Sequence, residues 1–303
     1  MNALTVTNLD VELSVTVYGD ANKPTLLFLH GFPDCQKTWD HQVNALKNNY
    51  QVVTFDMRGV GESTWSGKRN AYLIENLLSD IEAVINAVVG TTGKVHLVGH
   101  DWGSVIGWSF ISDPFYSKRI LSYSSMSGPH LALMFDWLKN NILSGDPGRV
   151  FNVLKQVSFS WYIYLFNLPF LPEFLFTRFG KPIWRTALMY NGVDKDDRYL
   201  NADQETIEKI VINAVNLYRQ NPLNPPPKPA PMSIKVPVQL LIPRDDVFIS
   251  HNLFEDYDSY VVQLTRHHIA GKHWTHHSHA QEFNEKISAF INQIEISVSN
   301  KAA

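Results

Sequence analysis

The clearest chemical signal in the sequence is a glycine-flanked segment, VGHDWGS, at residues 98–104. It lies between a β-branched run, KVHLVG, and a helical pattern, SVIGWSFI, which is the context in which a nucleophile occupies a sharp strand-to-helix turn. The two glycines permit this turn, because a Cβ atom would clash there. The nucleophile position holds Asp101, and a carboxylate attacks saturated carbon to give an alkyl ester of the enzyme. The alternative is an aspartate that only caps the following helix.

A second segment, HGFP at residues 30–33, follows the apolar run LLFL. A loop at the carboxyl end of a strand can present a backbone N–H to a developing oxyanion, and the second N–H of such a hole comes from the residue after the nucleophile. The two donors would be Phe32 and Trp102. The alternative is an ordinary bend after a strand.

Two further segments supply an acid and a base after predicted strands. PRDDVF at residues 243–248 offers two adjacent carboxylates, of which we expect Asp246 rather than Asp245 to orient a histidine. GKHWTHH at residues 271–277 offers His273 as the base, and the chain order nucleophile, acid, histidine is that of α/β-hydrolases. Six histidines lie between residues 267 and 279, but no acidic or cysteine partner stands at zinc spacing. We therefore expect no metal and no cofactor.

The elements that must position these residues alternate between strand and helix. Helical spacing of apolar residues appears at 72–88 and again at 283–294, and near-continuous apolar strands indicate a mostly parallel α/β sheet covered on both faces. The predicted strands are residues 11–18, 25–30, 51–55, 94–99, 120–126, 237–242 and 261–268.

The strand–helix alternation stops near residue 130. The following hundred residues are helical with aromatic clusters, and six prolines within residues 221–231 indicate a stiff, extended return linker. We predict one α/β domain in two parts, residues 1–130 and 234–303, interrupted by a helical cap at residues 131–233.

Composition excludes several classes of protein. With 26 Lys and Arg against 29 Asp and Glu, the net charge is −3, and no basic cluster suits nucleic acid. No apolar window approaches ~20 residues, so we expect no membrane span, and the first residues do not have the pattern of a signal peptide. The single cysteine, Cys35, excludes a disulfide framework and agrees with a cytoplasmic location.

Four motifs together resemble the epoxide hydrolases of the α/β-hydrolase fold: HGFP, DMRGVGES at residues 56–63, VGHDWG and KHWTHH. Haloalkane dehalogenases share an aspartate nucleophile followed by tryptophan, whereas HGFP favours epoxide hydrolases. The sequence departs from the family at Lys272, where glycine usually precedes the histidine.

The resemblance implies two cap tyrosines that protonate the leaving oxygen. NLYRQN at residues 216–221 resembles the segment that carries the second tyrosine, here Tyr218. WYIYLFNLP at residues 161–169 resembles the segment that carries the first. Alignment on Phe166 and Pro169 selects Tyr162, and Tyr164 is the alternative.

The function expected from the resemblance is opening of a lipophilic epoxide to a vicinal diol by water, through an ester on Asp101. We expect Phe32, Trp102, Tyr164 and Phe166 to contact the substrate. One alternative is a haloalkane dehalogenase, in which Trp102 and either Trp161 or Trp184 would hold the halide. A remote alternative is a protein that binds an apolar ligand without catalysis.

Overall fold

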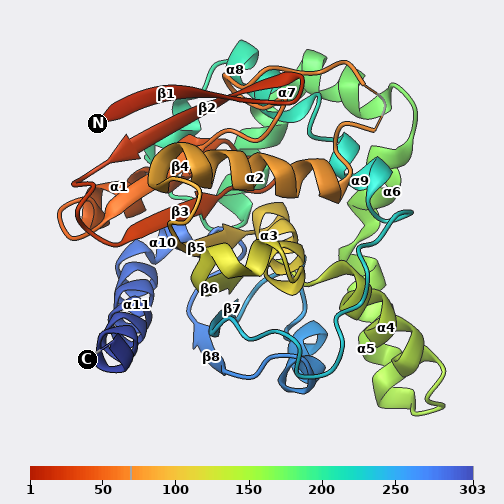
Figure 1. Cartoon of the computed structure of the whole chain (residues 1–303). Helices are drawn as coiled ribbons and strands as arrows, with labels where there is room; N and C mark the ends of the chain where they lie inside the picture. Colours follow the sequence, from red (N-terminus) through yellow and green to blue (C-terminus); the bar gives the residue numbers. More distant parts are fainter. Residues whose placement is uncertain (69, 303) are drawn as a thin grey trace.

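The computed structural model describes residues 1–68 and 70–302 of the chain, and the described strands form one eight-stranded sheet in the order β1-β2-β4-β3-β5-β6-β7-β8 (Figure 1). β1, β2 and β4 are joined by antiparallel pairing, whereas every other neighbouring pair is parallel. This confirms the mostly parallel sheet. The strands are β1 (Asn2–Asn8), β2 (Val11–Tyr18), β3 (Thr25–Leu29), β4 (Gln51–Phe55), β5 (Val95–His100), β6 (Ile120–Met126), β7 (Val238–Pro243) and β8 (Leu264–Ile269).

Two strands differ from the sequence prediction by more than one residue at an end. β1 was not predicted, because it is an edge strand in which only Val6 is fully buried and therefore has no strong apolar pattern. β8 begins three residues later than expected, at Leu264, while Val261 forms only an isolated bridge with Ile234.

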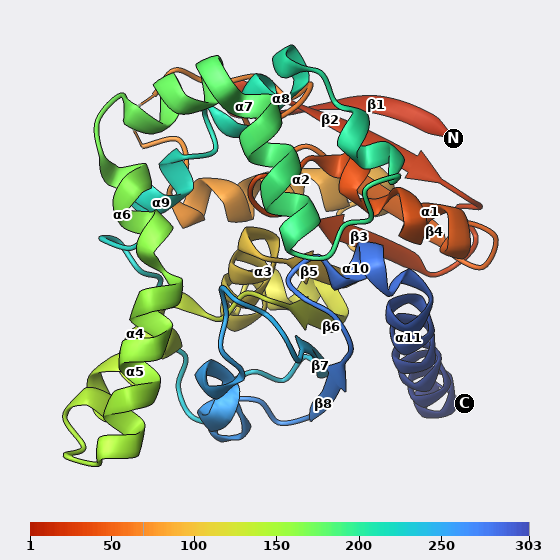
Figure 2. The same cartoon turned by 180° about the vertical axis from the view of Figure 1, so that it is seen from behind.

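Helices cover both faces of the sheet because successive side chains of a strand point to opposite faces. Leu27 and Leu97 pack in one core with α2 (Ile74–Val89) and α3 (Trp102–Ser112). Leu26, Phe28 and Val98 pack in a second core with α1 (Asp40–Leu46) and α11 (Ala280–Ala302). Figure 2 shows the face with α1 and α11, and Figure 1 the face with α2 and α3.

The chain between β6 and β7 contains helices and no strand, as predicted for residues 131–233. In Figure 1 these inserted helices, coloured green to cyan, extend along one side of the sheet and over its top. Residues 225–230 of the proline-rich stretch form neither helix nor strand. The inserted helices are α4 (Leu131–Ile142), α5 (Pro147–Phe159), α6 (Trp161–Asn167), α7 (Leu171–Tyr190), α8 (Gln204–Val211) and α9 (Asn216–Gln220), with the short 3₁₀ helix η3 (Arg198–Asn201).

Short helices complete the fold: η1 (Gln36–Trp39), η2 (Tyr116–Arg119), η4 (His251–Ser259) and α10 (Thr275–Ser278). None of the described helices combines the length and the apolar character needed to cross a bilayer.

Candidate active site

Asp101 forms the whole turn between β5 and α3, with φ 52° and ψ −122°. Residues other than glycine rarely adopt these backbone angles. The conformation costs about 1–3 kcal/mol and is found mainly at functional sites. The neighbouring glycines allow the close approach: a Cβ on Gly103 would lie 2.1 Å from the carbonyl oxygen of Leu29, and one on Gly99 would lie 2.7 Å from that of Gly103. The Asp101 carboxylate makes no capping hydrogen bond to α3, which excludes the capping alternative.

His273 lies between two carboxylates. Its Nε2 is 3.5 Å from Oδ2 of Asp101, and its Nδ1 is 3.0 Å from Oδ2 of Asp246. Asp246 follows β7 and His273 follows β8, so the carboxyl ends of neighbouring parallel strands bring the pair together. Asp245, the other acid considered, is exposed, whereas only 2% of the Asp246 side chain is exposed. The structure therefore places Asp101, His273 and Asp246 in one row.

The electrostatics of this row favour a protonated imidazole. Burial alone would lower the pKa of His273, but Asp246 above all, together with Asp101, raises it to about 10. Burial likewise opposes ionisation of Asp246, yet His273 and the Phe248 N–H hold the pKa of this carboxyl below its usual range. These shifts favour an imidazolium beside the Asp246 carboxylate.

The backbone N–H of Phe32 donates to Oδ1 of Asp101 over 2.7 Å. The two oxygens of Asp101 therefore differ: Oδ1 is held by this N–H, and Oδ2 faces His273. Trp102, the second predicted donor, is the first residue of α3, where a backbone N–H has no partner within the helix.

Tyr162 and Tyr218 come from α6 and α9 and meet beside Asp101. Their ring centroids are 5.7 Å apart, and the Tyr218 ring also lies 5.2 Å from that of Trp102. Burial, reinforced by the Asp101 carboxylate, raises the pKa of both phenols well above 10. Both side chains are therefore neutral proton donors. Tyr164 is 68% exposed, which favours Tyr162 as the first tyrosine.

A cavity of about 330 Å³ joins the row and the tyrosines. Phe32 and Phe166 line this cavity, as expected for substrate contacts, whereas Trp102 and Tyr164 line an adjoining one that also reaches Asp101. Other lining residues were not predicted from the sequence: Phe176, Phe248, Ile183 and Trp274. Two of them are close in sequence to predicted site residues, which is a signal that could have found them: Phe248 follows Asp246 by two residues, and Trp274 directly follows His273.

A buried network supports the loop that carries His273. Asp34 accepts hydrogen bonds from the Trp274 indole and the Tyr199 hydroxyl, both over 2.9 Å. His100 Nε2 lies 2.9 Å from the carbonyl oxygen of His273. These residues were missed, although Asp34 directly follows HGFP and His100 directly precedes the nucleophile position.

Lys272, which departs from the family pattern, binds the end of α7. Its ammonium donates to the Tyr190 carbonyl over 2.7 Å and lies 4.4 Å from the centroid of that ring. Two residues after Lys272, the backbone N–H of Trp274 donates to the Asn191 carbonyl over 3.2 Å. The departure thus attaches the His273 loop to the inserted helices.

The tryptophans considered as halide donors are placed unfavourably for that role. The indole N–H of Trp184 donates to the Pro33 carbonyl over 2.8 Å, and the Trp161 side chain is mostly exposed. Trp102 hydrogen-bonds with Tyr218, which modestly opposes the rise in the pKa of that phenol. The alternative in which Trp184 holds a halide is disfavoured, because its indole N–H already has a partner.

Comparison with known proteins gives a consistent result. A family model described as the alpha/beta hydrolase fold matches residues 24–280. The protein named probable oxidoreductase EphD from Mycobacterium tuberculosis is 28% identical over 279 residues, covering 89% of this chain and 46% of that protein. The chain thus spans about half the length of that relative.

Two other similarities cover at least nine-tenths of this chain. The mouse protein named epoxide hydrolase 4 is 27% identical over 286 residues, covering 91% of this chain and 75% of that protein. The solved structure of an epoxide hydrolase from Bacillus megaterium with an inhibitor superposes with a TM-score of 0.76 at 24% identity, covering 96% of this chain and all of that one.

Proposed function

The chain belongs to the α/β-hydrolase fold family, and on this premise we propose that it hydrolyses epoxides to vicinal diols through an alkyl ester of Asp101. The observation that carries the proposal is a carboxylate nucleophile and two neutral phenols around one apolar cavity. Relatives named epoxide hydrolase, matched over nine-tenths of this chain, support the reaction class.

The first step is attack by Asp101 on an oxirane carbon. Oδ2 is the attacking oxygen, because Oδ1 is held by the Phe32 N–H. The C–O bond of the ring breaks, and Tyr162 or Tyr218 donates a proton to the departing oxygen. Assistance of this kind contributes typically 10²–10⁴-fold. The phenols remain protonated at neutral pH because their pKa values are raised.

Formation of the ester prepares His273 for the second step. The negative charge of Asp101 disappears, so one of the two carboxylates that raise the pKa of His273 is lost. His273 then releases its proton, which replaces the proton given by the tyrosine. The imidazole becomes a neutral general base, and Asp246 keeps it in position.

The second step is hydrolysis of the ester. His273 takes a proton from water as the water attacks Cγ of Asp101, and the negative charge develops on Oδ1. The N–H groups of Phe32 and Trp102 stabilise this charge, and each such donor is worth roughly 10²–10³ in rate. The Cγ–Oδ2 bond breaks, and the departing alkoxide takes the second proton of the attacking water, so that the diol leaves with Oδ2. His273 keeps the proton it took, and the new carboxylate keeps the oxygen of water.

The inserted helices, residues 131–233, act in this proposal as a cap over the carboxylate. They supply both phenols and an aromatic wall that includes Phe166 and Phe176. The cavity lining is apolar apart from the reacting groups, which suits a lipophilic epoxide. We place the reaction in the cytoplasm, with which the single buried cysteine, Cys35, agrees.

Trapping the ester tests the proposal. In His273→Ala the first step is retained and the second lacks its base, so the protein incubated with styrene oxide should gain the mass of one substrate. Peptide mapping should place the added mass on Asp101. Asp101→Ala is the matched control and should gain no mass. An unmodified His273→Ala protein that nevertheless binds the epoxide would contradict the covalent scheme.

A further inference from the structure

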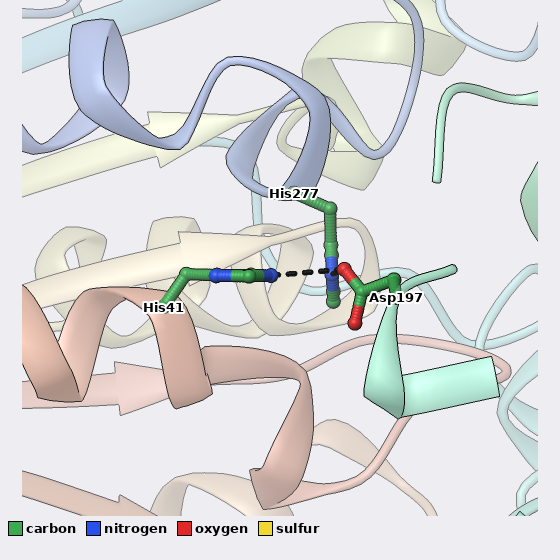
Figure 3. Close-up of side chains that lie close together, drawn as sticks. All are labelled: His41, Asp197 and His277. Atoms are coloured by element: carbon green, nitrogen blue, oxygen red, sulfur yellow. Dashed lines mark hydrogen bonds and ion pairs between the residues drawn. The ribbon is translucent and has the colours of Figure 1, made fainter. Parts of the chain in front are cut away.

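A second group of chemically active side chains lies outside the active-site cavity, where three distant segments meet (Figure 3). His41 comes from α1, His277 from α10, and Asp197 directly precedes η3 among the inserted helices. His41 Nε2 is 2.9 Å and His277 Nδ1 is 3.0 Å from the same oxygen, Oδ2 of Asp197. The three potential ligand atoms all lie within 4.8 Å of one another.

We propose that His41, Asp197 and His277 bind a divalent transition-metal ion, with zinc as the best match. Two imidazole nitrogens and one carboxylate oxygen are a usual zinc donor set, and a water completes the tetrahedron. Calcium and magnesium prefer oxygen ligands alone, which argues against them here. Zinc holds these donors at about 2.0–2.2 Å, so they need to move by roughly 1 Å at most to surround the ion.

Two of the three ligands are already oriented. The His277 side chain is 1% exposed, and its second nitrogen, Nε2, lies 2.9 Å from the Thr38 hydroxyl. The other Asp197 oxygen, Oδ1, accepts the Tyr199 N–H over 2.9 Å. Such outer contacts fix the direction of a ligand and are a regular feature of metal sites.

Proton positions are compatible with binding. Without metal, each ring donates an N–H to the Asp197 carboxylate, and these hydrogen bonds lower the pKa of Asp197 although burial opposes ionisation. With metal, the two nitrogens must offer lone pairs. His277 then carries its proton on Nε2, where Thr38 accepts it, and His41 carries its proton on Nδ1.

The site is open to solvent from one side. His41 is 46% exposed in its side chain, and the cluster borders a cleft of about 450 Å³. Three further carboxylates and two cationic side chains line this cleft. The excess of negative charge attracts positive ions. The carboxylates are Asp40, Asp194 and Asp196, and the cations are Lys37 and Arg198.

Metal binding would fasten the cap to the core beside the catalytic loop. His277 lies four residues after His273, and Asp197 belongs to the inserted helices. The sequence expectation of no metal considered only partners near the histidine run, whereas the structure supplies an aspartate and a histidine from 80 and 236 residues away. This inference is independent of epoxide hydrolysis.

Titration of the untagged 303-residue chain with zinc chloride after removal of metal by a chelator tests the site. Calorimetry should show one strong site per chain, and Co²⁺ in place of zinc should give the visible absorption of tetrahedral coordination. His41→Gln and Asp197→Asn should each weaken binding by at least about 100-fold, because loss of outer-shell partners alone costs 10–100-fold. Zinc should raise the Tm of the wild-type chain and leave that of both variants unchanged.

The matched control is His251→Gln, which removes an exposed histidine that is not part of the cluster and should bind zinc as the wild type does. The proposal is overturned if the wild type lacks a strong site, or if His41→Gln and Asp197→Asn bind zinc as tightly as it does. Calorimetry, Co²⁺ absorption and the Tm all report metal binding, so absence of epoxide turnover would not affect them.

Discussion

The strand-edge residues and the inserted helices contribute to the same cavity but are held in different ways. Asp101, Asp246 and His273 follow parallel strands whose hydrogen bonds fix the distances between them. Tyr162 and Tyr218 lie on short helices that meet through aromatic contacts. In the proposed mechanism this difference separates the steps: the sheet positions the groups that make and hydrolyse the ester, and the helices position those that receive the epoxide.

A change at the strand edge should have the largest effect. Asp246→Asn removes the main group that raises the pKa of His273, so this pKa should fall from about 10, and diol formation should drop on the order of 10⁴-fold. NMR titration of the imidazole and steady-state rates measure the two effects. An unchanged imidazole titration would mean that Asp246 does not hold the proton on His273.

Loss of a phenol should have an intermediate effect, confined to the first step. In Tyr218→Phe we expect diol formation to fall about 10²-fold, because one proton donor is missing while Tyr162 remains. Single-turnover kinetics should show slow ester formation and normal ester hydrolysis. Retention of full rate, with halide released from 1-bromobutane, would favour dehalogenation instead.

A change that only loosens the inserted helices should have the smallest effect. Arg219 donates from Nε to the Phe166 carbonyl over 2.8 Å and pairs with Glu173, so it joins α9 to α6 and α7. Arg219→Met should lower kcat/KM about tenfold. The two phenols remain present in this variant but are held less accurately beside the substrate. His273 in this variant should titrate as in the wild type, and a shifted titration would show that the two regions are not separable.

The same contrast explains what the sequence could predict. VGHDWGS, PRDDVF and KHWTHH each follow an apolar strand, and parallel strands bring their carboxyl ends together, so Asp101, Asp246 and His273 were found from local pattern. The α/β-hydrolase fold is confirmed by the family match. For the tyrosines, only the resemblance to a family gave positions, because nothing in local spacing shows where a helix packs.

Long-range contacts between polar residues that do not directly follow neighbouring strands could not be predicted. Asp34 meets Trp274 across 240 residues, and Asp197 meets His277 across 80 residues. Neither pair has a fixed spacing, because each depends on how the inserted helices and the last loops pack. Trp184 shows the same limit. The sequence shows that an indole is present, but it does not show that the indole N–H donates to the Pro33 carbonyl.

Because the Phe32 N–H holds one oxygen of Asp101 by a hydrogen bond, an oxygen taken from solvent should be released one turnover after it is taken up. If that contact prevents the carboxylate from rotating, each oxygen taken from solvent waits one cycle and leaves with the next diol. In heavy-oxygen water the first product molecule should be unlabelled and the second fully labelled, as mass spectrometry of stoichiometric and then excess substrate would show. A second product that is only half labelled would mean that the carboxylate rotates between cycles.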